Sequence, residues 1–297
     1  MRVAIILASY NGNKFLKAQI NSILWQSHRD VSLYIHDDGS TDGTLDILEA
    51  FRSNPRITVL QDNVITGSAS GNFIHLLRTI PLDAYDYIGF SDQDDIWDPD
   101  KISRALAVLK ESGADGYSSD LITFGNYKHR PKKITKGGRP ARYDYLFQGA
   151  SAGCTYLFSQ MLAMKVIATL EQFSFSDLAQ RSHDWVVYAI ARHNNYKWVH
   201  DDNCTVFYRQ HGKNVYGAGL GWRGSKARFN KVKEGWYRNN ILWNAMTVLG
   251  LQDDPWVARV RRNSYLDKVY LAMSVNLFRR KLRDRIALAI MLLIGAF

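Results

Sequence analysis

The stretch Tyr87-Ile88-Gly89-Phe90-Ser91-Asp92-Gln93-Asp94-Asp95 decides how this chain is interpreted, because an apolar run ends abruptly in a group of carboxylates. Strand side chains alternate between two faces, so Asp92 and Asp94 point the same way if strand geometry continues through them. Such carboxylates repel each other unless a cation lies between them. Hard oxygen ligands at a strand end suit Mg²⁺ or Mn²⁺, which indicates a divalent-cation site. The alternative is an acidic turn that caps the helix beginning at Pro99.

The first hundred residues alternate between short apolar runs and amphipathic helical patterns. Strands are predicted at 3–8, 31–36, 57–60 and 86–90, and helices at 13–25, 41–52 and 70–79. This alternation predicts an α/β fold with a mainly parallel sheet flanked by helices. Ligands of such sheets bind beyond the carboxyl ends of the strands. Three polar clusters occupy such ends, at 9–12, 37–40 and 92–95, and they predict one substrate crevice.

The pattern becomes mixed between residues 114 and 212. Strands are predicted at 116–124, 155–158, 197–199 and 205–208, and helices at 160–170 and 185–192. Residues 128–142 hold seven basic residues and no acidic one, with two prolines and two glycines. This composition predicts a mobile basic surface loop, and contact with a polyanion or a membrane is the alternative.

The net charge of +10 is unevenly distributed along the 297 residues. Residues 222–297 hold 15 basic and 5 acidic residues, which accounts for the whole excess. A boundary near 219–221 is therefore expected, with a main domain over 1–221 and a helical basic extension over 222–297. Within the main domain, residues 1–112 form the first half and residues 113–221 the second. Cys154 and Cys204 are the two cysteines, and as widely spaced buried thiols they suit a reducing cytoplasm.

The C-terminal extension combines cations, tryptophans and an apolar end. The basic run 279–285 precedes twelve uncharged, largely apolar residues, which are too few to span a bilayer. This pattern predicts peripheral attachment to the cytoplasmic face of the membrane, with the aromatic residues at the interface. A buried C-terminal helix or a homo-oligomer contact is the alternative. A nucleic-acid partner is not expected, because no nucleic-acid-binding motif accompanies the charge.

Several classes of nucleotide-dependent enzyme are disfavoured. The loop after the first strand lacks the glycine spacing of a dinucleotide-binding turn, and the chain has no Walker-type loop and no kinase motif set. Gly217, Gly219 and Gly221 come late in the chain and predict a hinge or loop.

Three ordered motifs resemble the signatures of glycosyltransferase family 2. They are Ala8-Ser9-Tyr10-Asn11-Gly12, Asp37–Thr44 (DDGSTDGT) and Phe90–Trp97 (FSDQDDIW). With Tyr208–Asn214 (YRQHGKN), the wording is most similar to the bacterial rhamnosyltransferase branch. The resemblance covers about residues 1–215. It implies the GT-A fold and a metal-dependent transfer that inverts the anomeric centre.

The resemblance also implies residue roles at the donor site. Asp38 matches the aspartate that binds the pyrimidine ring, and it is a suitable acceptor for an imide N–H. An Asx turn or a helix cap is its alternative role. Ser9, Tyr10 and Asn11 match the loop that touches base and ribose. Asp92 and Asp94 match the DxD pair of the family, which contacts ribose and metal. Asp92, Gln93 and Arg209 complete the expected donor contacts. Asp94 and His211 are the expected metal ligands.

Inverting transfer needs a base opposite the leaving diphosphate. Asp184 matches the catalytic acidic position of the family, and a simple helix cap is the alternative. The expected sugar and acceptor pocket contains Gly149, Trp97, His183 and Trp185. Either tryptophan is equally consistent with the protein core.

The function implied is transfer of a sugar from a nucleotide-sugar donor, dTDP-L-rhamnose or alternatively a UDP-hexose, to a polyprenyl-diphosphate-linked bacterial surface glycan. The rivals are a sugar-1-phosphate nucleotidylyltransferase, whose glycine-rich Lys-containing loop is missing, and a non-catalytic module that binds glycans or membranes.

Overall fold

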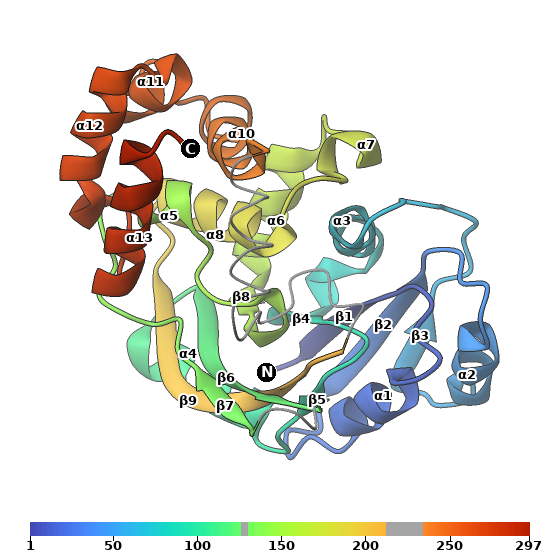
Figure 1. Cartoon of the computed structure of the whole chain (residues 1–297). Helices are drawn as coiled ribbons and strands as arrows, with labels where there is room; N and C mark the ends of the chain where they lie inside the picture. The colour runs from blue at the N-terminus through green and yellow to red at the C-terminus, as the bar shows by residue number, and fades with distance from the viewer. Residues whose placement is uncertain (126–129, 212–233) are drawn as a thin grey trace.

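The computed structural model describes residues 1–125, 130–211 and 234–297, which are built around one mixed sheet (Figure 1). The strand order is β3-β2-β1-β4-β8-β6-β9-β5, and β7 pairs with β6. The strands are β1 (Val3–Ser9), β2 (Val31–Asp37), β3 (Ile57–Val59), β4 (Tyr87–Ser91), β5 (Ile96–Trp97), β6 (Gly116–Phe124), β7 (Lys132–Ile134), β8 (Leu157–Ser159) and β9 (Trp198–Arg209). The predicted α/β fold is confirmed.

The first half of the sheet is parallel and places the polar clusters at one edge. Strand β1 pairs in parallel with β2 on one side and with β4 on the other, and β3 extends the sheet beyond β2. The chain moves outward from β1 to β3 and then returns to the opposite side of β1 as β4. A crevice opens at the carboxyl ends of the strands at such a reversal. The clusters at 9–12, 37–40 and 92–95 follow β1, β2 and β4 at this edge.

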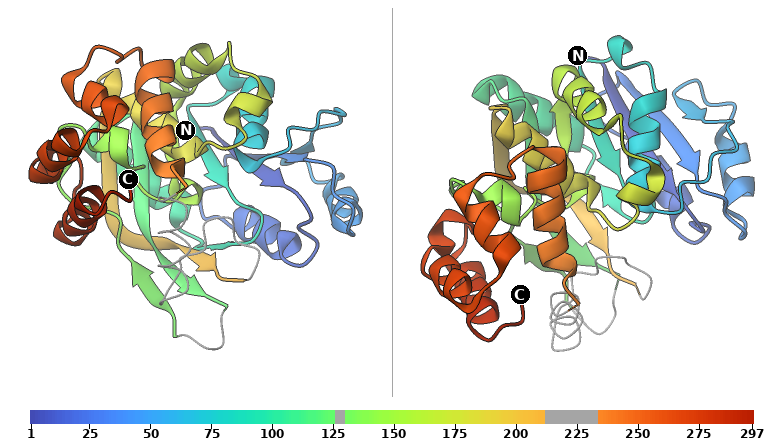
Figure 2. Two further views of the ribbon diagram at one scale, coloured as in Figure 1. Left: turned by 45° about the horizontal axis from the view of Figure 1, so that its top comes forward. Right: turned by 90° about the horizontal axis from the view of Figure 1, so that it is seen from above.

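Helices cover both faces of the sheet (Figure 2). Alternate residues of β1 face opposite layers, with Ala4 and Ile6 against α3, α6 and α8, and with Ile5 and Leu7 against α1 and α4. All four side chains are fully buried. The helices of this part are α1 (Leu16–Leu24), α2 (Thr44–Phe51), α3 (Ala69–Thr79), α4 (Lys101–Ser112), α5 (Asp144–Phe147), α6 (Gln160–Leu170), α7 (Phe175–Leu178) and α8 (His183–His193).

Three expectations for these elements are wrong. β9 is continuous where two short strands were expected, because its backbone pairing with β6 persists through a polar middle section with register shifts near Asp120. Part of the expected basic loop forms β7, which pairs antiparallel with β6, and residues 126–129 of that loop lie outside the described residues. The helical pattern of 41–52 also predicts Leu45 on the apolar side of α2, but this side chain is 57% exposed.

The C-terminal helices pack into the same core as the sheet, at the corner opposite α2 (Figure 1). They are α10 (Trp236–Leu242), which continues as the π-helical segment η3 (Trp243–Val248), then α11 (Pro255–Arg262), α12 (Tyr265–Met273) and α13 (Leu282–Leu293). Tyr237 is 7% exposed and Trp256 packs against Phe278, so these aromatic side chains face inward rather than toward a membrane. No helix within the described ranges is long and apolar enough to cross a membrane. The expected boundary and its glycines, with Trp222, lie outside the described residues.

A buried carboxylate joins these helices to the rest of the chain. Asp144 is fully buried, and its Oδ1 accepts a hydrogen bond from Arg192 Nη1 of α8 at 2.9 Å. Its Oδ2 accepts from Tyr188 Oη at 3.1 Å and lies 3.5 Å from Arg280 Nε. The Arg280 side chain, between α12 and α13, is only 6% exposed. One carboxylate therefore neutralises guanidinium groups from two parts of the fold.

Replacing Asp144 with Asn should lower the free energy of unfolding by about 3 kcal/mol, because two buried guanidinium groups lose the negative charge they share. Urea unfolding followed by circular dichroism measures the change. The matched control is Asp284→Asn, which removes a carboxylate beside the 87% exposed side chain of Arg283, and there we expect a change below about 0.5 kcal/mol. Equal losses in the two variants would show that the buried pair does not stabilise the junction.

Candidate active site

The loop after β1 is held to the loop after β4 by Gln93. Its Oε1 accepts from Tyr10 N and its Nε2 donates to Tyr10 O, both at 2.9 Å. A Cβ at Gly12 would lie 2.3 Å from Gln93 Oε1, so glycine is required for this close approach. Asn11, with φ of +49°, accepts from Thr41 N at 2.9 Å and joins the loop after β2. Gln93, expected to bind the donor, thus links two loops, while the Tyr10 side chain is exposed beside it.

Asp38 lies at the carboxyl end of β2 and is 7% exposed. Its N–H donates to Ser9 O at 2.9 Å, and its Oδ1 accepts from Thr66 N at 2.5 Å. No donor from the described ranges is bonded to its Oδ2. That oxygen is therefore available to accept the imide N–H of a pyrimidine ring. The alternative turn-forming role belongs to Asp37, whose carboxylate accepts from Ser40 N at 2.8 Å.

Two buried histidines and Asp62 form a cluster beside the end of β2, just before Asp38 in the chain. His36 Nε2 and His75 Nε2 contact opposite oxygens of Asp62, at 3.1 and 2.9 Å. His36 Nδ1 is 2.9 Å from Asn72 Oδ1, and the Asn72 amide donates to the His36 carbonyl at 3.3 Å. Burial alone would raise the pKa of Asp62, but hydrogen bonding and charge from His75 lower it overall. This cluster ties the end of β2 to α3. The sequence did not reveal it, because its members are up to 39 residues apart.

The carboxylates after β4 converge with Asp184 from α8. The pKa of Asp92 is raised to about 7, first by burial and then by the charges of Asp94 and Asp184. Asp95 is fully buried, and burial together with the charges of Asp92 and Asp94 raises its pKa well above the ordinary value. Cys154 Sγ and carboxylate oxygens of Asp92 and Asp95 lie within 4.8 Å of one another. Elements far apart in sequence therefore concentrate negative charge at one point.

A buried lysine lies behind this acidic group. Lys101 begins α4 and is fully buried, with Nζ 3.7 Å from the centre of the Trp97 ring. Nζ has no hydrogen-bond partner among the described residues, and it lies near Cys154 and Asp95. Burial lowers the pKa of Lys101 to about 7. Of the two roles that the sequence left open for Trp97, the structure supports the core position, because this ring is 2% exposed and covered by the lysine.

The end of β9 closes the other side of the acidic loop. Arg209 N donates to Asp95 Oδ1 at 3.0 Å, and Arg209 Nε donates to Asp94 O at 2.8 Å. The guanidinium lies 4.5 Å from the Phe15 ring centre. His211 Nε2 is 2.6 Å from Asp94 Oδ2, so the structure brings together the two expected metal ligands. Arg209, expected at the donor, contacts the acidic loop directly.

Asp184 lies in the first turn of α8, after the N-cap residue Ser182. Its Oδ1 accepts from Ser182 Oγ, and from Trp185 N at 2.8 Å. Within the described part of the chain no hydrogen bond reaches its Oδ2. The helix-cap role and the general-base role of Asp184 are therefore compatible, because Oδ1 bonds the helix end while Oδ2 is open to an acceptor hydroxyl. The charge of Asp184 contributes to the raised pKa of Asp92, so the two carboxyl groups lie near each other.

Of the remaining residues expected at the acceptor, Trp185 is buried, while His183 and Gly149 are partly exposed. Trp185 is 5% exposed and its Nε1 donates to Tyr145 O at 2.8 Å, so its indole belongs to the core rather than to a sugar pocket. The His183 ring packs 4.1 Å from Phe73, and burial lowers the pKa of this histidine. Gly149 faces the Trp185 backbone, and its carbonyl accepts a hydrogen bond from Arg280.

The chemistry of the converging groups fits a hard divalent cation. Asp92, Asp94 and His211 offer carboxylate oxygens and an imidazole nitrogen, which suit Mg²⁺ or Mn²⁺. Burial, followed by the charges of Asp94 and Asp184, raises the pKa of Asp92, and a cation bound beside it would favour its ionised form. Cys154 does not suggest a softer metal, because burial followed by the neighbouring carboxylates raises the pKa of its thiol and keeps it protonated.

Known proteins are similar to this chain in sequence or in fold. Residues 4–162 match the family described as Glycosyl transferase family 2. The dTDP-rhamnosyl transferase RfbG of Shigella flexneri is 36% identical over 295 residues, covering 98% of this chain and 100% of that protein. The Escherichia coli UDP-Glc:alpha-D-GlcNAc-diphosphoundecaprenol beta-1,3-glucosyltransferase WfaP is 34% identical over 136 residues, or 44% of this chain and 52% of that protein. The S. aureus TarS 1–349 structure with UDP-GlcNAc has a TM-score of 0.57 at 17% identity, covering 100% of this chain and 79% of that one.

Lys101→Met should stabilise the protein most at neutral pH. The folded pKa is about 7, below the ordinary 10.5, so between these values the unfolded chain binds more protons and stability rises with pH. From this group the slope is at most about 1.4 kcal/mol per pH unit. The advantage of the variant should therefore shrink between pH 7 and pH 10, as measured by urea unfolding at both values.

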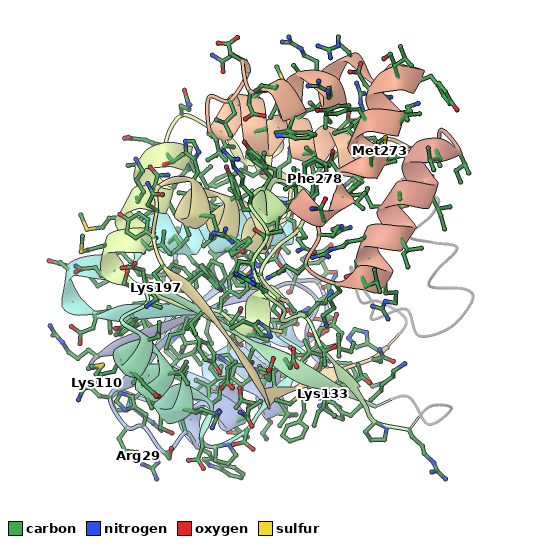
Figure 3. All side chains as sticks on the ribbon, turned by 90° about the vertical axis from the view of Figure 1, so that its left-hand side faces the viewer. Arg29, Lys110, Lys133, Lys197, Met273 and Phe278 are labelled. Carbon is green, nitrogen blue, oxygen red and sulfur yellow. The ribbon has the colours of Figure 1, made fainter. Side chains whose placement is uncertain are left out.

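The matched control for this prediction is Lys110→Met, an exposed lysine of the same helix (Figure 3). Its unfolding free energy relative to the unmodified protein should be independent of pH. A constant difference for Lys101→Met across the same range would mean that its ammonium group is not a buried charge.

Proposed function

Because this chain belongs to glycosyl transferase family 2 and is therefore a glycosyltransferase, we propose that it transfers L-rhamnose from dTDP-L-rhamnose to a lipid-linked surface glycan. The observation that carries the proposal is the convergence of Asp92, Asp94 and Asp184 at the reversal point of the sheet, beside Asp38. Transfer from an activated sugar needs three groups together. One accepts a hydrogen bond from the nucleotide's pyrimidine ring, one helps neutralise the charge of the diphosphate, and one accepts the proton of the attacking hydroxyl.

The donor lies along the edge formed by the loops after β1, β2 and β4. Asp38 Oδ2 accepts the imide N–H of the pyrimidine, Tyr10 lies beside the base, and Asp92 contacts the ribose. GT-A enzymes typically bind a divalent cation, and Asp94 with His211 would hold it here. When bound, such a cation neutralises the diphosphate leaving group. Arg209 fixes the acidic loop through its bonds to Asp94 and Asp95.

Asp184 is the general base. Its Oδ2 takes the proton of the acceptor hydroxyl, whose oxygen attacks the anomeric carbon on the face opposite the diphosphate. The bond between that carbon and the diphosphate oxygen breaks, the configuration inverts, and the nucleoside diphosphate leaves. The hydrogen bonds from Ser182 and Trp185 to Oδ1 fix the orientation of the carboxylate and leave Oδ2 for the acceptor hydroxyl.

Rhamnose is favoured as the donor sugar because the relative matched along its full length is described as a dTDP-rhamnosyl transferase. A UDP-hexose is the alternative, since WfaP is described as acting with UDP-Glc. Titration of dTDP-L-rhamnose, UDP-glucose and UDP-N-acetylglucosamine by calorimetry, with and without Mn²⁺, distinguishes the two. Tighter binding of either UDP-sugar would replace the rhamnose assignment.

A lipid-diphosphate-linked acceptor suits the outer surface of the last two long helices. Four apolar side chains of α13 lie one above another at helical spacing and are at least half exposed, and α12 continues this surface. The exposed members are Tyr265, Leu266, Tyr270, Met273, Leu282, Ile286, Ile290 and Leu293. We call this the α12–α13 face; Met273 is labelled in Figure 3. Basic residues at 281, 283 and 285 adjoin it, so we infer attachment to the anionic cytoplasmic face of the membrane.

Asp184→Asn and Asp94→Asn should each reduce sugar transfer more than a hundredfold. The first variant loses the proton acceptor and should still bind donor, while the second should lose the dependence of donor binding on Mn²⁺. Radiolabelled sugar transfer and calorimetry measure the two effects. Asp46→Asn, an exposed carboxylate of α2, is the control and should retain full activity. Full activity of Asp184→Asn would remove this residue from the proposed reaction.

The double variant Leu282→Glu with Ile286→Glu should bind phosphatidylglycerol vesicles at least about tenfold more weakly, because it places two charges on a surface that enters the lipid interface. Co-sedimentation with vesicles measures this, and phosphatidylcholine vesicles test the role of charge. Met161→Glu, which alters a 66% exposed apolar side chain on α6, should bind as the unmodified protein does. Unchanged sedimentation of the double variant would exclude the α12–α13 face as the contact.

A further inference from the structure

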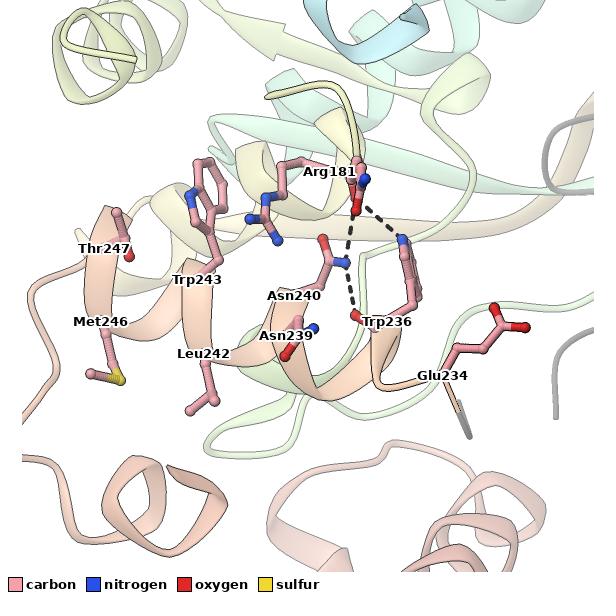
Figure 4. A pocket seen from close by; sticks show the side chains of 10 residues that line it. Arg181, Glu234, Trp236, Asn239, Asn240, Leu242, Trp243, Met246 and Thr247 are labelled. Carbon is pink, nitrogen blue, oxygen red and sulfur yellow. Dashed lines mark hydrogen bonds between the residues drawn. The ribbon is translucent and has the colours of Figure 1, made fainter. Parts of the chain in front are cut away.

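A hollow of about 490 Å³ lies between the α7–α8 connection and the helix formed by α10 and η3 (Figure 4). Gln180 and Arg181 form one wall, and Glu234, Trp236, Asn239 and Trp243 form much of the other. None of these residues belongs to the donor edge described above. The sequence predicts a membrane interface for the tryptophans of this region.

The hollow is built onto the segment that carries the proposed base. Arg181 is three residues before Asp184, so their Cα atoms are at most about 11 Å apart. Trp236 lies 6.4 Å from the ring of Trp185, and its Nε1 donates to Gln180 O at 3.2 Å. The hollow therefore adjoins the segment that leads into α8 and its Asp184.

The chemistry of the walls is that of a carbohydrate site. Sugars present apolar C–H faces and a rim of hydroxyl groups, which aromatic rings and planar polar side chains recognise together. Trp236 and Trp243 are partly exposed here, and Asn239 and Glu234 are exposed beside them. The Arg181 guanidinium lies 4.8 Å from the Trp243 ring, with its N–H groups at the edge of the hollow (Figure 4).

The charges of the walls argue against an anionic occupant. Among the residues that the structure describes, Arg181 and Glu234 are the charged side chains of the hollow, and they carry opposite signs. A site for the diphosphate of a lipid carrier would need an excess of cations. An acyl chain would need a continuous apolar wall, which the amides and charged groups interrupt. Neutral sugar residues fit both conditions.

We propose that this hollow binds sugar residues of the acceptor glycan next to the residue that is glycosylated. The proposal rests on the proposed function, since it assigns an acceptor subsite to the same reaction. It places the recognition of the growing chain on the C-terminal helices, whereas the donor is recognised by the loops of the sheet. Trp97 and Trp185, which are enclosed in the core, have no part in it.

The test uses the full chain and three probes: methyl α-L-rhamnoside, N-acetyl-D-glucosamine and a rhamnosyl-α-1,3-rhamnose disaccharide. Saturation-transfer NMR detects binding, and the affinity comes from tryptophan fluorescence. We expect at least one probe to bind, and Trp243→Ala and Asn239→Ala each to weaken it about tenfold. Asn239 is exposed, so its replacement keeps the test valid if the tryptophan variant fails to fold.

Trp25→Ala is the matched control, because Trp25 is a 74% exposed tryptophan at the end of α1, and it should not alter sugar binding. Binding of dTDP, measured in parallel, should be unchanged in every variant. If no probe binds while dTDP does, or if both hollow variants bind as the unmodified protein does, the subsite is excluded and the proposed function stands. Failure to bind any nucleotide would count against the proposed function itself.

Discussion

Repulsion among carboxylates is the constraint around which this fold is arranged. Asp92, Asp94 and Asp95 follow one strand, and Asp184 approaches them from a helix ninety residues later. Folding must overcome this repulsion before any ligand arrives. Hydrogen-bond donors and a cation surround the cluster. Arg209 donates to the Asp95 carboxylate and to the Asp94 carbonyl, and Lys101 lies buried behind them. In the proposed function, a divalent cation bound between these carboxylates and the diphosphate of the donor would balance the remaining charge.

The proposed donor and acceptor sites are built from different parts of the chain. The proposed nucleotide edge belongs to the parallel strands and their loops, which are joined by Gln93 and by the Asp62 cluster. The proposed acceptor side depends on the C-terminal helices, which are anchored through Asp144 and whose Arg280 reaches the Gly149 carbonyl. Such a division lets one half of the fold keep its nucleotide chemistry while the other half varies with the glycan.

The sequence predicted the parallel strands and the site motifs well, because apolar strands and the polar loops at their ends leave local patterns. β6 and α6 occur at the residues predicted. It could not predict what depends on tertiary contact. A lysine four residues after Trp97 is usually on a helix surface, and only the packing of α4 under the acidic loop buries Lys101. The same limit applies to Trp97, Trp185 and Trp236, whose identical chemistry serves the core or a cavity wall depending on neighbours far away in sequence.

The two thiols add a last consequence. Burial raises the pKa of Cys154 and of Cys204, so neither sulfur is an appreciable thiolate near neutral pH. Neither cysteine is thus a readily alkylated thiol, even though the sulfur of Cys154 adjoins the acidic loop. Inactivation by a maleimide would report loosening of the packing around these thiols rather than chemistry on a catalytic sulfur.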